Sequence, residues 1–327
     1  MYKIILAGCG SMCRAWLEVI KKRGDCIFVG FADPIAANAE KVRDEYGLTA
    51  SIYGDIDSAL EAETANLVID VTVPEAHAGV VTAALSAGCD VFGEKPMSDT
   101  LEDAERMVNV ADGTGKNYFV MQNRRYTAGI AALKRFLSSG ELGKIGQVSA
   151  DFRLSPRFGG FRDEMDSPLL ADMAIHTFDA ARFITGRNAV SVYCREFNPE
   201  WSWYKGSASA VALFDMEDGI VFDYRGSWCA NGLNTSWESE WRVACERGAV
   251  FWDGSSKLHY GLADGGGVTD IPIPQMEGEG HAACIADMFD ALESGTRTQT
   301  DCRDNINSIR MVHKAIESAK NRQNIKI

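Results

Sequence analysis

A carboxylate and an imidazole stand four residues apart in the sequence, at Asp172 and His176. The apolar pattern around them predicts one helix over Ser167–Thr185, and residues four apart share a face of a helix. An imidazole beside a carboxylate can take a proton from a hydroxyl near neutral pH, and the carboxylate then stabilises the imidazolium. We therefore interpret the pair as a site for acid–base chemistry.

Two other interpretations of this helix stay open. An isolated Asp–His pair is more often a structural contact than a catalytic one. Asp172, His176 and Asp179 could also serve as metal ligands. The chain has no Cys/His cluster with the spacing of a structural zinc site, so we predict no metal.

A third chemistry-bearing residue is Lys95, in the segment Gly93-Glu94-Lys95-Pro96. The segment ends a predicted strand, proline stops that strand, and ligands of open α/β sheets lie at such strand ends. The ammonium of Lys95 could stabilise a developing alkoxide, with Glu94 holding it by an ion pair. Whether Lys95 or His176 receives the proton stays open, and we favour His176.

A glycine turn, Gly8-Cys9-Gly10-Ser11-Met12-Cys13, follows the first predicted strand and opens the first predicted helix. The first glycine allows the tight bend, the second lets a pyrophosphate approach the backbone, and the helix start attracts its charge. Asp33, at the end of the second predicted strand, can accept hydrogen bonds from ribose hydroxyls and repel a 2′-phosphate. The pattern predicts an NAD site, with NADP less favoured; the alternative is a structural turn with a surface aspartate.

Cys13 stands where glycine or alanine is usual in this turn. Cys9 and Cys13 could sense oxidation there, but we favour inert packing of both thiols.

Together with Thr72-Val73-Pro74-Glu75-Ala76-His77, Ala87-Gly88 and Asn123-Arg124-Arg125-Tyr126, these motifs resemble the Gfo/Idh/MocA family of glucose–fructose oxidoreductase and inositol dehydrogenase. They run in the family's order over most of the chain, although Ala174 stands where many members have glycine. The resemblance implies that Lys95, Asp172 and His176 are catalytic. It implies an enzyme that transfers a hydride between NAD and a secondary hydroxyl of a sugar, glycoside or inositol-like polyol.

The resemblance also implies two binding sets. The cofactor set is Gly8, Gly10, Ser11, Met12, Asp33, Thr72, Pro74, His77, Glu94, Lys95 and Asn123. The substrate set is Lys95, Arg125, Tyr126, Asp172 and His176. His77 is equally well explained as a helix cap or packing residue, and Arg125 and Tyr126 as an interdomain ion pair and a rim aromatic. We treat His259, His281 and His313 as structural.

A chain of 327 residues is expected to form two domains, which would position the residues named above. Over residues 1–122 short apolar strands alternate with amphipathic helices, which predicts a doubly wound parallel sheet of the Rossmann type. The predicted strands are Lys3–Ala7, Ile27–Ala32, Leu67–Val71, Val91–Gly93 and Tyr118–Met121. The predicted helices are Ser11–Lys22, Ile35–Tyr46, Glu75–Ala87 and Leu101–Gly113, the last capped from Ser98-Asp99-Thr100.

Residues 123–327 follow another pattern. Gln147–Leu154 and Val190–Thr269 read as successive strands with turn signals at Glu217-Asp218-Gly219 and Asp253-Gly254, which predicts an α+β domain with a large, mainly antiparallel open sheet. Helices are predicted at Gly280–Glu293 and Asp304–Asn321, and we expect them to return to the first domain. The second domain is expected to bind substrate and to form a homodimer or homotetramer, because a sheet with one exposed face commonly packs against a partner.

The bulk composition limits the choice of partner. A net charge of −13 argues against nucleic acid, and no apolar run is long enough to cross a membrane. Nine cysteines without framework spacing, behind an N-terminus that begins directly with a strand, lead us to expect reduced thiols and a cytoplasmic protein.

Two rival functions belong to other classes. One is an enzyme that cleaves glycosides through transient oxidation by bound NAD, against which Lys95 counts, since such relatives tend to lack that lysine. The other is a catalytically silent, nucleotide-binding regulatory protein, against which the intact set of Lys95, Asp172 and His176 counts.

Overall fold

The computed structural model describes all residues, 1–327, and the chain divides into two compact units. The first unit comprises Met1–Asn123 and Gly278–Ile306. The second comprises Arg124–Glu277 and Asn307–Ile327. No helix is both long enough and apolar enough to span a bilayer.

A parallel sheet of six strands forms the centre of the first unit, in the order β3-β2-β1-β4-β5-β6. The strands are β1 (Tyr2–Ala7), β2 (Cys26–Ala32), β3 (Ser51–Tyr53), β4 (Leu67–Asp70), β5 (Asp90–Gly93) and β6 (Tyr118–Val120). Consecutive residues of β1, such as Ile4, Ile5 and Leu6, are all buried, as expected when helices cover both faces. The predicted doubly wound sheet is confirmed, and the strand order reverses between β1 and β4.

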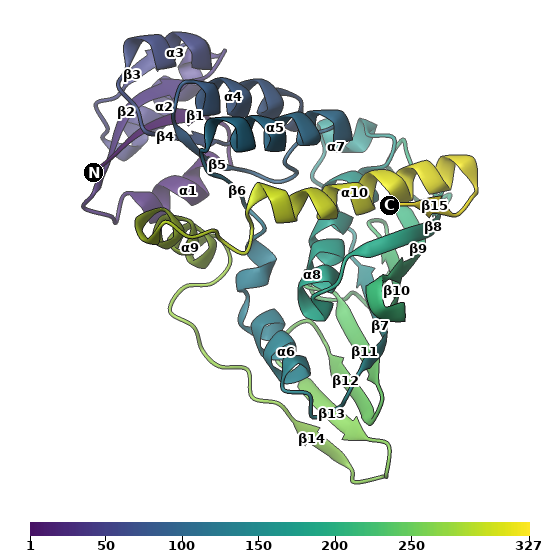
Figure 1. The fold of residues 1–327 in the computed structure, drawn as a ribbon. Coiled ribbons are helices and arrows are strands. Elements are labelled where there is room, and N and C mark those ends of the chain that lie inside the picture. The colour runs from purple at the N-terminus through teal and green to yellow at the C-terminus, as the bar shows by residue number, and fades with distance from the viewer. The chain divides into compact units, whose positions relative to one another are not determined.

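Helices cover both faces of this sheet. They are α1 (Cys13–Ile20), α2 (Ala36–Tyr46), α3 (Ile56–Ala62), α4 (Pro74–Ser86), α5 (Leu101–Thr114) and α9 (His281–Ser294). Within the unit, α4 and α5 lie side by side, and α1 lies beside α9 (Figure 1). Thr100 caps α5 by accepting a hydrogen bond from the Asp103 N–H, as predicted. The short elements β3 and α3 were not predicted.

A sheet of nine strands forms the second unit, in the order β14-β13-β12-β11-β7-β10-β9-β8-β15. The strands are β7 (Ile145–Arg153), β8 (Ala189–Phe197), β9 (Ser209–Met216), β10 (Val221–Ser227), β11 (Glu240–Cys245), β12 (Gly248–Trp252), β13 (Leu258–Leu262), β14 (Val268–Asp270) and β15 (Ile325–Lys326). All neighbours are antiparallel except β7 and β10, so the predicted mainly antiparallel sheet is confirmed. Along β9, buried and exposed residues alternate, which gives the sheet one covered and one open face.

The helix predicted over Ser167–Thr185 needs a correction. Its first part, Leu169–Ala174, is a π-helix, and only α8 (Ile175–Thr185) is α-helical. The wider i→i+5 bonding of a π-helix is frequent at functional sites, and sequence periodicity does not reveal it. Gly186 ends α8 in the left-handed conformation.

Three further helices complete the chain: α6 (Ala128–Ser138), α7 (Phe161–Glu164) and α10 (Cys302–Asn321). The two C-terminal helices, both expected to return to the first domain, divide between the units. All of α9 belongs to the first unit, whereas most of α10, from Asn307 onward, belongs to the second.

Candidate active site

The glycine turn after β1 has the form that an anion site requires. A Cβ on Gly8 would lie 2.6 Å from the carbonyl carbon of Val71, and its φ is +86°, so only glycine fits. Nothing lies within 4 Å of a Cβ built on Gly10. The N–H groups of Gly10, Ser11 and Met12 find no acceptor in the chain, at the N-terminal end of α1. These donors fit a pyrophosphate.

Asp33 follows β2 directly and is buried against this turn. Its Oδ2 accepts a hydrogen bond from the Cys9 N–H at 2.8 Å, and its Oδ1 accepts one from the Ile35 N–H at 2.8 Å. The carboxylate therefore braces the glycine turn. Oδ1 also accepts a hydrogen bond from Nδ2 of Asn38 at 3.4 Å, so the second lone pair of Oδ2 is the one left for the predicted ribose contact.

The two cysteines of the turn are buried and unlike redox sensors. Burial raises the pKa of the Cys9 thiol to about 12 and that of the Cys13 thiol to about 11. Both thiols are therefore protonated near neutral pH, whereas oxidation proceeds through the thiolate. This result favours the packing interpretation of both residues.

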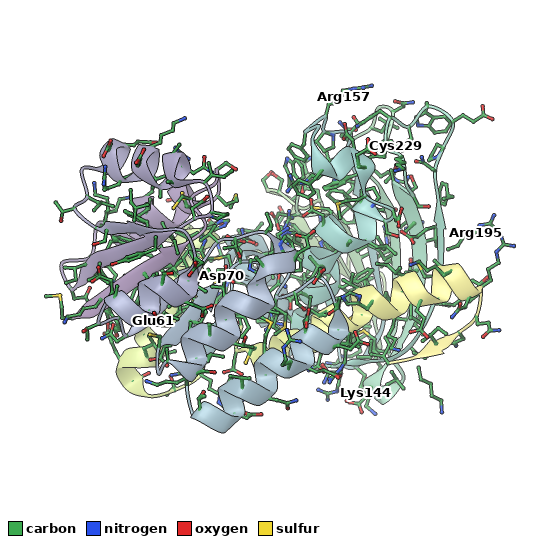
Figure 2. All side chains as sticks on the ribbon, turned by 90° about the horizontal axis from the view of Figure 1, so that it is seen from above. Glu61, Asp70, Lys144, Arg157, Arg195 and Cys229 are labelled. Atoms are coloured by element: carbon green, nitrogen blue, oxygen red, sulfur yellow. The ribbon has the colours of Figure 1, made fainter.

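Thr72, His77 and Asp70 form a buried hydrogen-bond network where β4 ends and α4 begins. The Nδ1 of His77 lies 2.7 Å from Oδ2 of Asp70, and the Thr72 hydroxyl donates to Oδ1 of Asp70 at 2.6 Å. Burial lowers the pKa of His77, but the charge and hydrogen bond of Asp70 raise it more, so the net shift is upward. Figure 2 marks Asp70 in the first unit. His77 thus braces β4 against α4, which begins at Pro74.

Glu94, directly after β5, is a buried carboxylate with several donors. Its Oε1 accepts from the indole N–H of Trp16 at 2.9 Å and lies 3.6 Å from Nε2 of His281. Its Oε2 accepts from the backbone N–H of Lys95 at 3.1 Å. Burial raises the pKa of Glu94, but His281, Trp16 and Lys95 together lower it below the ordinary value, so the group stays ionised.

Asn123 begins a short 3-10 helix, Asn123–Tyr126, and is linked to the same group. Its Nδ2 lies 3.2 Å from Nδ1 of His281. Sequence reasoning missed Trp16 and His281 as partners of Glu94. A histidine after Gly278-Glu279-Gly280 at a helix start gives no sign of which strand end it will reach.

In the second unit, Asp172 lies in the π-helix and pairs with Arg162 of α7. The distance from Arg162 Nε to Asp172 Oδ2 is 2.6 Å. The guanidinium also lies over the ring of Phe161, 4.6 Å from its centroid. A fixed cation beside Asp172 favours its ionised form. His176 is the second residue of α8 and is buried. Arg162 was not among the predicted site residues.

Arg125, predicted to bind substrate, forms a buried ion pair in the second unit. Its Nε and Nη2 contact Oδ2 and Oδ1 of Asp179 at 2.7 and 2.6 Å, and both side chains are buried. Ser308 also donates to Asp179, at 2.7 Å. The geometry makes Arg125 a brace between the 3-10 helix and α8. The same ion pair engages Asp179, the third residue considered above as a metal ligand. Tyr126 is buried.

Comparison with known proteins adds the family. Residues 2–122 match the Gfo/Idh/MocA family, described as "Oxidoreductase family, NAD-binding Rossmann fold". Residues 130–251 match the Gfo/Idh/MocA C-terminal domain. The chain belongs to the Gfo/Idh/MocA family. It is thus an oxidoreductase with a nicotinamide-binding Rossmann domain, and the resemblance predicted from its motifs is confirmed.

Several family members resemble it along nearly their whole length. D-apiose dehydrogenase of Rhizobium rhizogenes is 27% identical over 98% of this chain and 96% of its own. Inositol 2-dehydrogenase of Rhizobium meliloti is 23% identical over 98% of each. A solved structure of an oxidoreductase of Agrobacterium radiobacter, in complex with NAD+, L-tartaric acid and magnesium, matches with a TM-score of 0.90. The two chains are 22% identical, and the match covers 99% of this chain and 98% of the other.

Within the family framework, the predicted residues fall into two groups. The first unit contains the whole predicted cofactor set, arranged along the ends of β1, β2, β4, β5 and β6. The second unit contains Asp172, His176, Arg125 and Tyr126. The predicted catalytic set is therefore divided, with Lys95 in the first unit and its two partners in the second.

Proposed function

We propose that this oxidoreductase uses NAD to oxidise a secondary hydroxyl of a sugar, glycoside or inositol-like polyol, reversibly. The observation that carries the proposal is the end of β5, where Lys95 follows the buried, ionised Glu94 in the unit that also holds the open glycine turn. The names of the relatives support the substrate class, since they include an inositol dehydrogenase and a D-apiose dehydrogenase.

The first unit would hold the cofactor. The free N–H groups of Gly10, Ser11 and Met12 would bind the pyrophosphate, and Asp33 would accept the ribose hydroxyls and disfavour a 2′-phosphate. Thr72, Pro74 and Asn123, at neighbouring strand ends, would face the nicotinamide half. When bound, NAD supplies the hydride acceptor.

The second unit would supply the base. A hydroxyl loses hydride readily only as its proton leaves, so His176 takes that proton while Asp172 stabilises the imidazolium. Arg162 keeps Asp172 ionised and limits its freedom to turn. Lys95 donates a hydrogen bond to the same oxygen and stabilises the alkoxide charge. The proposal requires both units to act on one hydroxyl.

The decisive experiment is NADH formation against a panel of sugars, inositols and glycosides, followed by absorbance. We expect turnover with at least one secondary alcohol, without release of free sugar from a glycoside. Release of monosaccharide without net NADH would favour the glycoside-cleaving rival, and NAD binding without any turnover would favour the regulatory one.

The pH profile of kcat/KM then tests the base. We expect an acid limb in the histidine range, lost in His176→Ala together with most of the rate. Asp172→Asn should move the limb to lower pH because a negative charge that favours the imidazolium is gone. An acid limb that is unchanged in His176→Ala, where chemistry limits the rate, transfers the base role to Lys95.

A further inference from the structure

Three exposed aromatic side chains lie together in the second unit, and we call them the aromatic platform: Phe158, Phe161 and Trp237. Their exposed fractions are 54%, 60% and 43%, although side chains of this kind are largely buried in most folded chains. The ring centroids of Phe158 and Trp237 are 6.1 Å apart. Exposed apolar side chains that are clustered, unlike single ones, mark a surface that binds something.

A glycine turn brings the two phenylalanines of the platform together. Phe158 and Phe161 flank Gly159 and Gly160, whose φ values of +68° and +69° are left-handed, a conformation that glycine adopts without strain. Both rings lie against one guanidinium, that of Arg162. Its central carbon is 5.4 Å from the centroid of Phe158 and 4.6 Å from that of Phe161.

Arg162 also connects the platform to Asp172. Its Nε donates to Oδ2 of Asp172 at 2.6 Å, whereas its two Nη groups find no acceptor in the chain. The Arg162 side chain is 32% exposed, so these N–H groups can reach a ligand. Aromatic faces that stack on the C–H face of a sugar ring, next to N–H donors for its hydroxyls, are suited to a carbohydrate.

Trp237 is held beside the helix that carries His176. Two residues further on, the hydroxyl of Ser239 lies 3.2 Å from that of Thr177, which directly follows His176 on α8, and both hydroxyls are buried. Trp237 also packs against Phe152 of β7, with 6.2 Å between the ring centroids. The platform is therefore linked to both members of the predicted acid–base pair, at Asp172 through Arg162 and at His176 through this contact.

We propose that the substrate is a glycoside, whose second ring lies on the aromatic platform while the ring to be oxidised lies against Asp172 and His176. The second ring is another sugar or an aromatic aglycone. The centroids of Phe158 and Trp237 alone are 6.1 Å apart, which leaves room for a whole ring besides the one at the acid–base pair. The inference rests on the proposed oxidation at that pair and narrows its substrate class to glycosides.

The test compares substrates that differ only in the second ring. The kcat and KM for NADH formation are measured for each monosaccharide of the panel and for its methyl and phenyl glycosides, with NAD saturating. For the preferred sugar we expect kcat/KM of the phenyl glycoside to exceed that of the methyl glycoside by about threefold to tenfold, as for one aromatic stacking contact. The gain should come from a lower KM, because the contact is made before and during the reaction alike.

Variants then locate the gain on the platform. In Phe158→Ala the ratio of kcat/KM between phenyl and methyl glycoside should fall toward one. Phe197→Ala is the matched control, since Phe197 is 44% exposed on the open face of the sheet and should not affect the ratio. Phe158 also packs against Trp228, with 6.1 Å between the centroids. If Phe158→Ala does not fold, Phe158→Leu takes its place, because leucine keeps apolar volume but has no aromatic face.

The outcomes separate the inference from the proposed function. Equal kcat/KM for the two glycosides in the unaltered protein, or a gain that survives in the Phe158 variant, overturns the inference while leaving sugar oxidation intact. A variant that changes the sedimentation of the protein but not the ratio assigns the platform to an interface between copies of the chain, which also overturns it. Absence of NADH formation with every substrate overturns the proposed function itself.

Discussion

Arg125→Met is expected to destabilise the second unit by about 3 kcal/mol, at the lower end of the range for breaking a buried ion pair. The guanidinium contacts both oxygens of Asp179, and removing it leaves a buried carboxylate without its main cation. Ser308 still donates to that carboxylate and Arg182 lies 3.7 Å away, which is why the loss stays at the lower end.

The assay is urea unfolding of a double-mutant cycle with Asp179→Leu. The double variant should lose less stability than the two single losses added together, by about 2 kcal/mol or more, because neither charge is then left alone. Arg187→Met is the matched control, since its pair with Asp218 is exposed and should contribute less than about 1 kcal/mol. If Arg125→Met costs less than about 1 kcal/mol and instead raises KM, Arg125 contacts substrate and the brace assignment is refuted.

Other predictions test the remaining assignments. Asp33→Ser should narrow the preference for NAD over NADP in calorimetric titrations, and tighter NADP binding by the unaltered protein would contradict it. Lys95→Ala should lose about 100-fold or more in kcat with NAD affinity nearly intact, and a near-normal rate would make Lys95 structural. Gly8→Ala should abolish NAD binding or folding, because its Cβ would collide with Val71; normal binding would refute the turn geometry. Burial raises the pKa of Glu196 to about 7. Folding therefore favours the protonated form of Glu196. The stability that this protonated group contributes to the fold is present below about pH 4 and is lost as the pH rises through about 7. Glu196→Gln should thus stabilise the protein by about 1–3 kcal/mol near pH ~8 and hardly at all near pH ~4, as thermal unfolding would show.

The sequence predicted the elements whose pattern is local and strong. The buried runs of β1 and β4 and the capped start of α5 needed no tertiary information. The strand β3 and the helix α3 are too short for a periodic signal. The π-helix before α8 was missed because its composition is that of an ordinary helix.

In the candidate site, too, the sequence predicted the features that depend on residues adjacent in the chain. The glycine turn is a local motif, and its geometry follows from residues adjacent in sequence. The partners of Glu94 and Asp172 are a different case, because Trp16, His281 and Arg162 are placed by packing of separate elements. A single sequence carries no signal for such pairings.

Four carboxylates described above differ in the exposed fraction of their side chains, and this difference limits what each can contact. The side chains of Asp70, Asp179 and Glu94 are 0%, 2% and 9% exposed, and each is held by a histidine or an arginine. A carboxylate covered in this way orients its neighbours but has little access to a substrate. Asp172 is 13% exposed, and its partner Arg162 is 32% exposed. Of the four, Asp172 is the carboxylate most open to solvent, which fits its predicted contact with substrate.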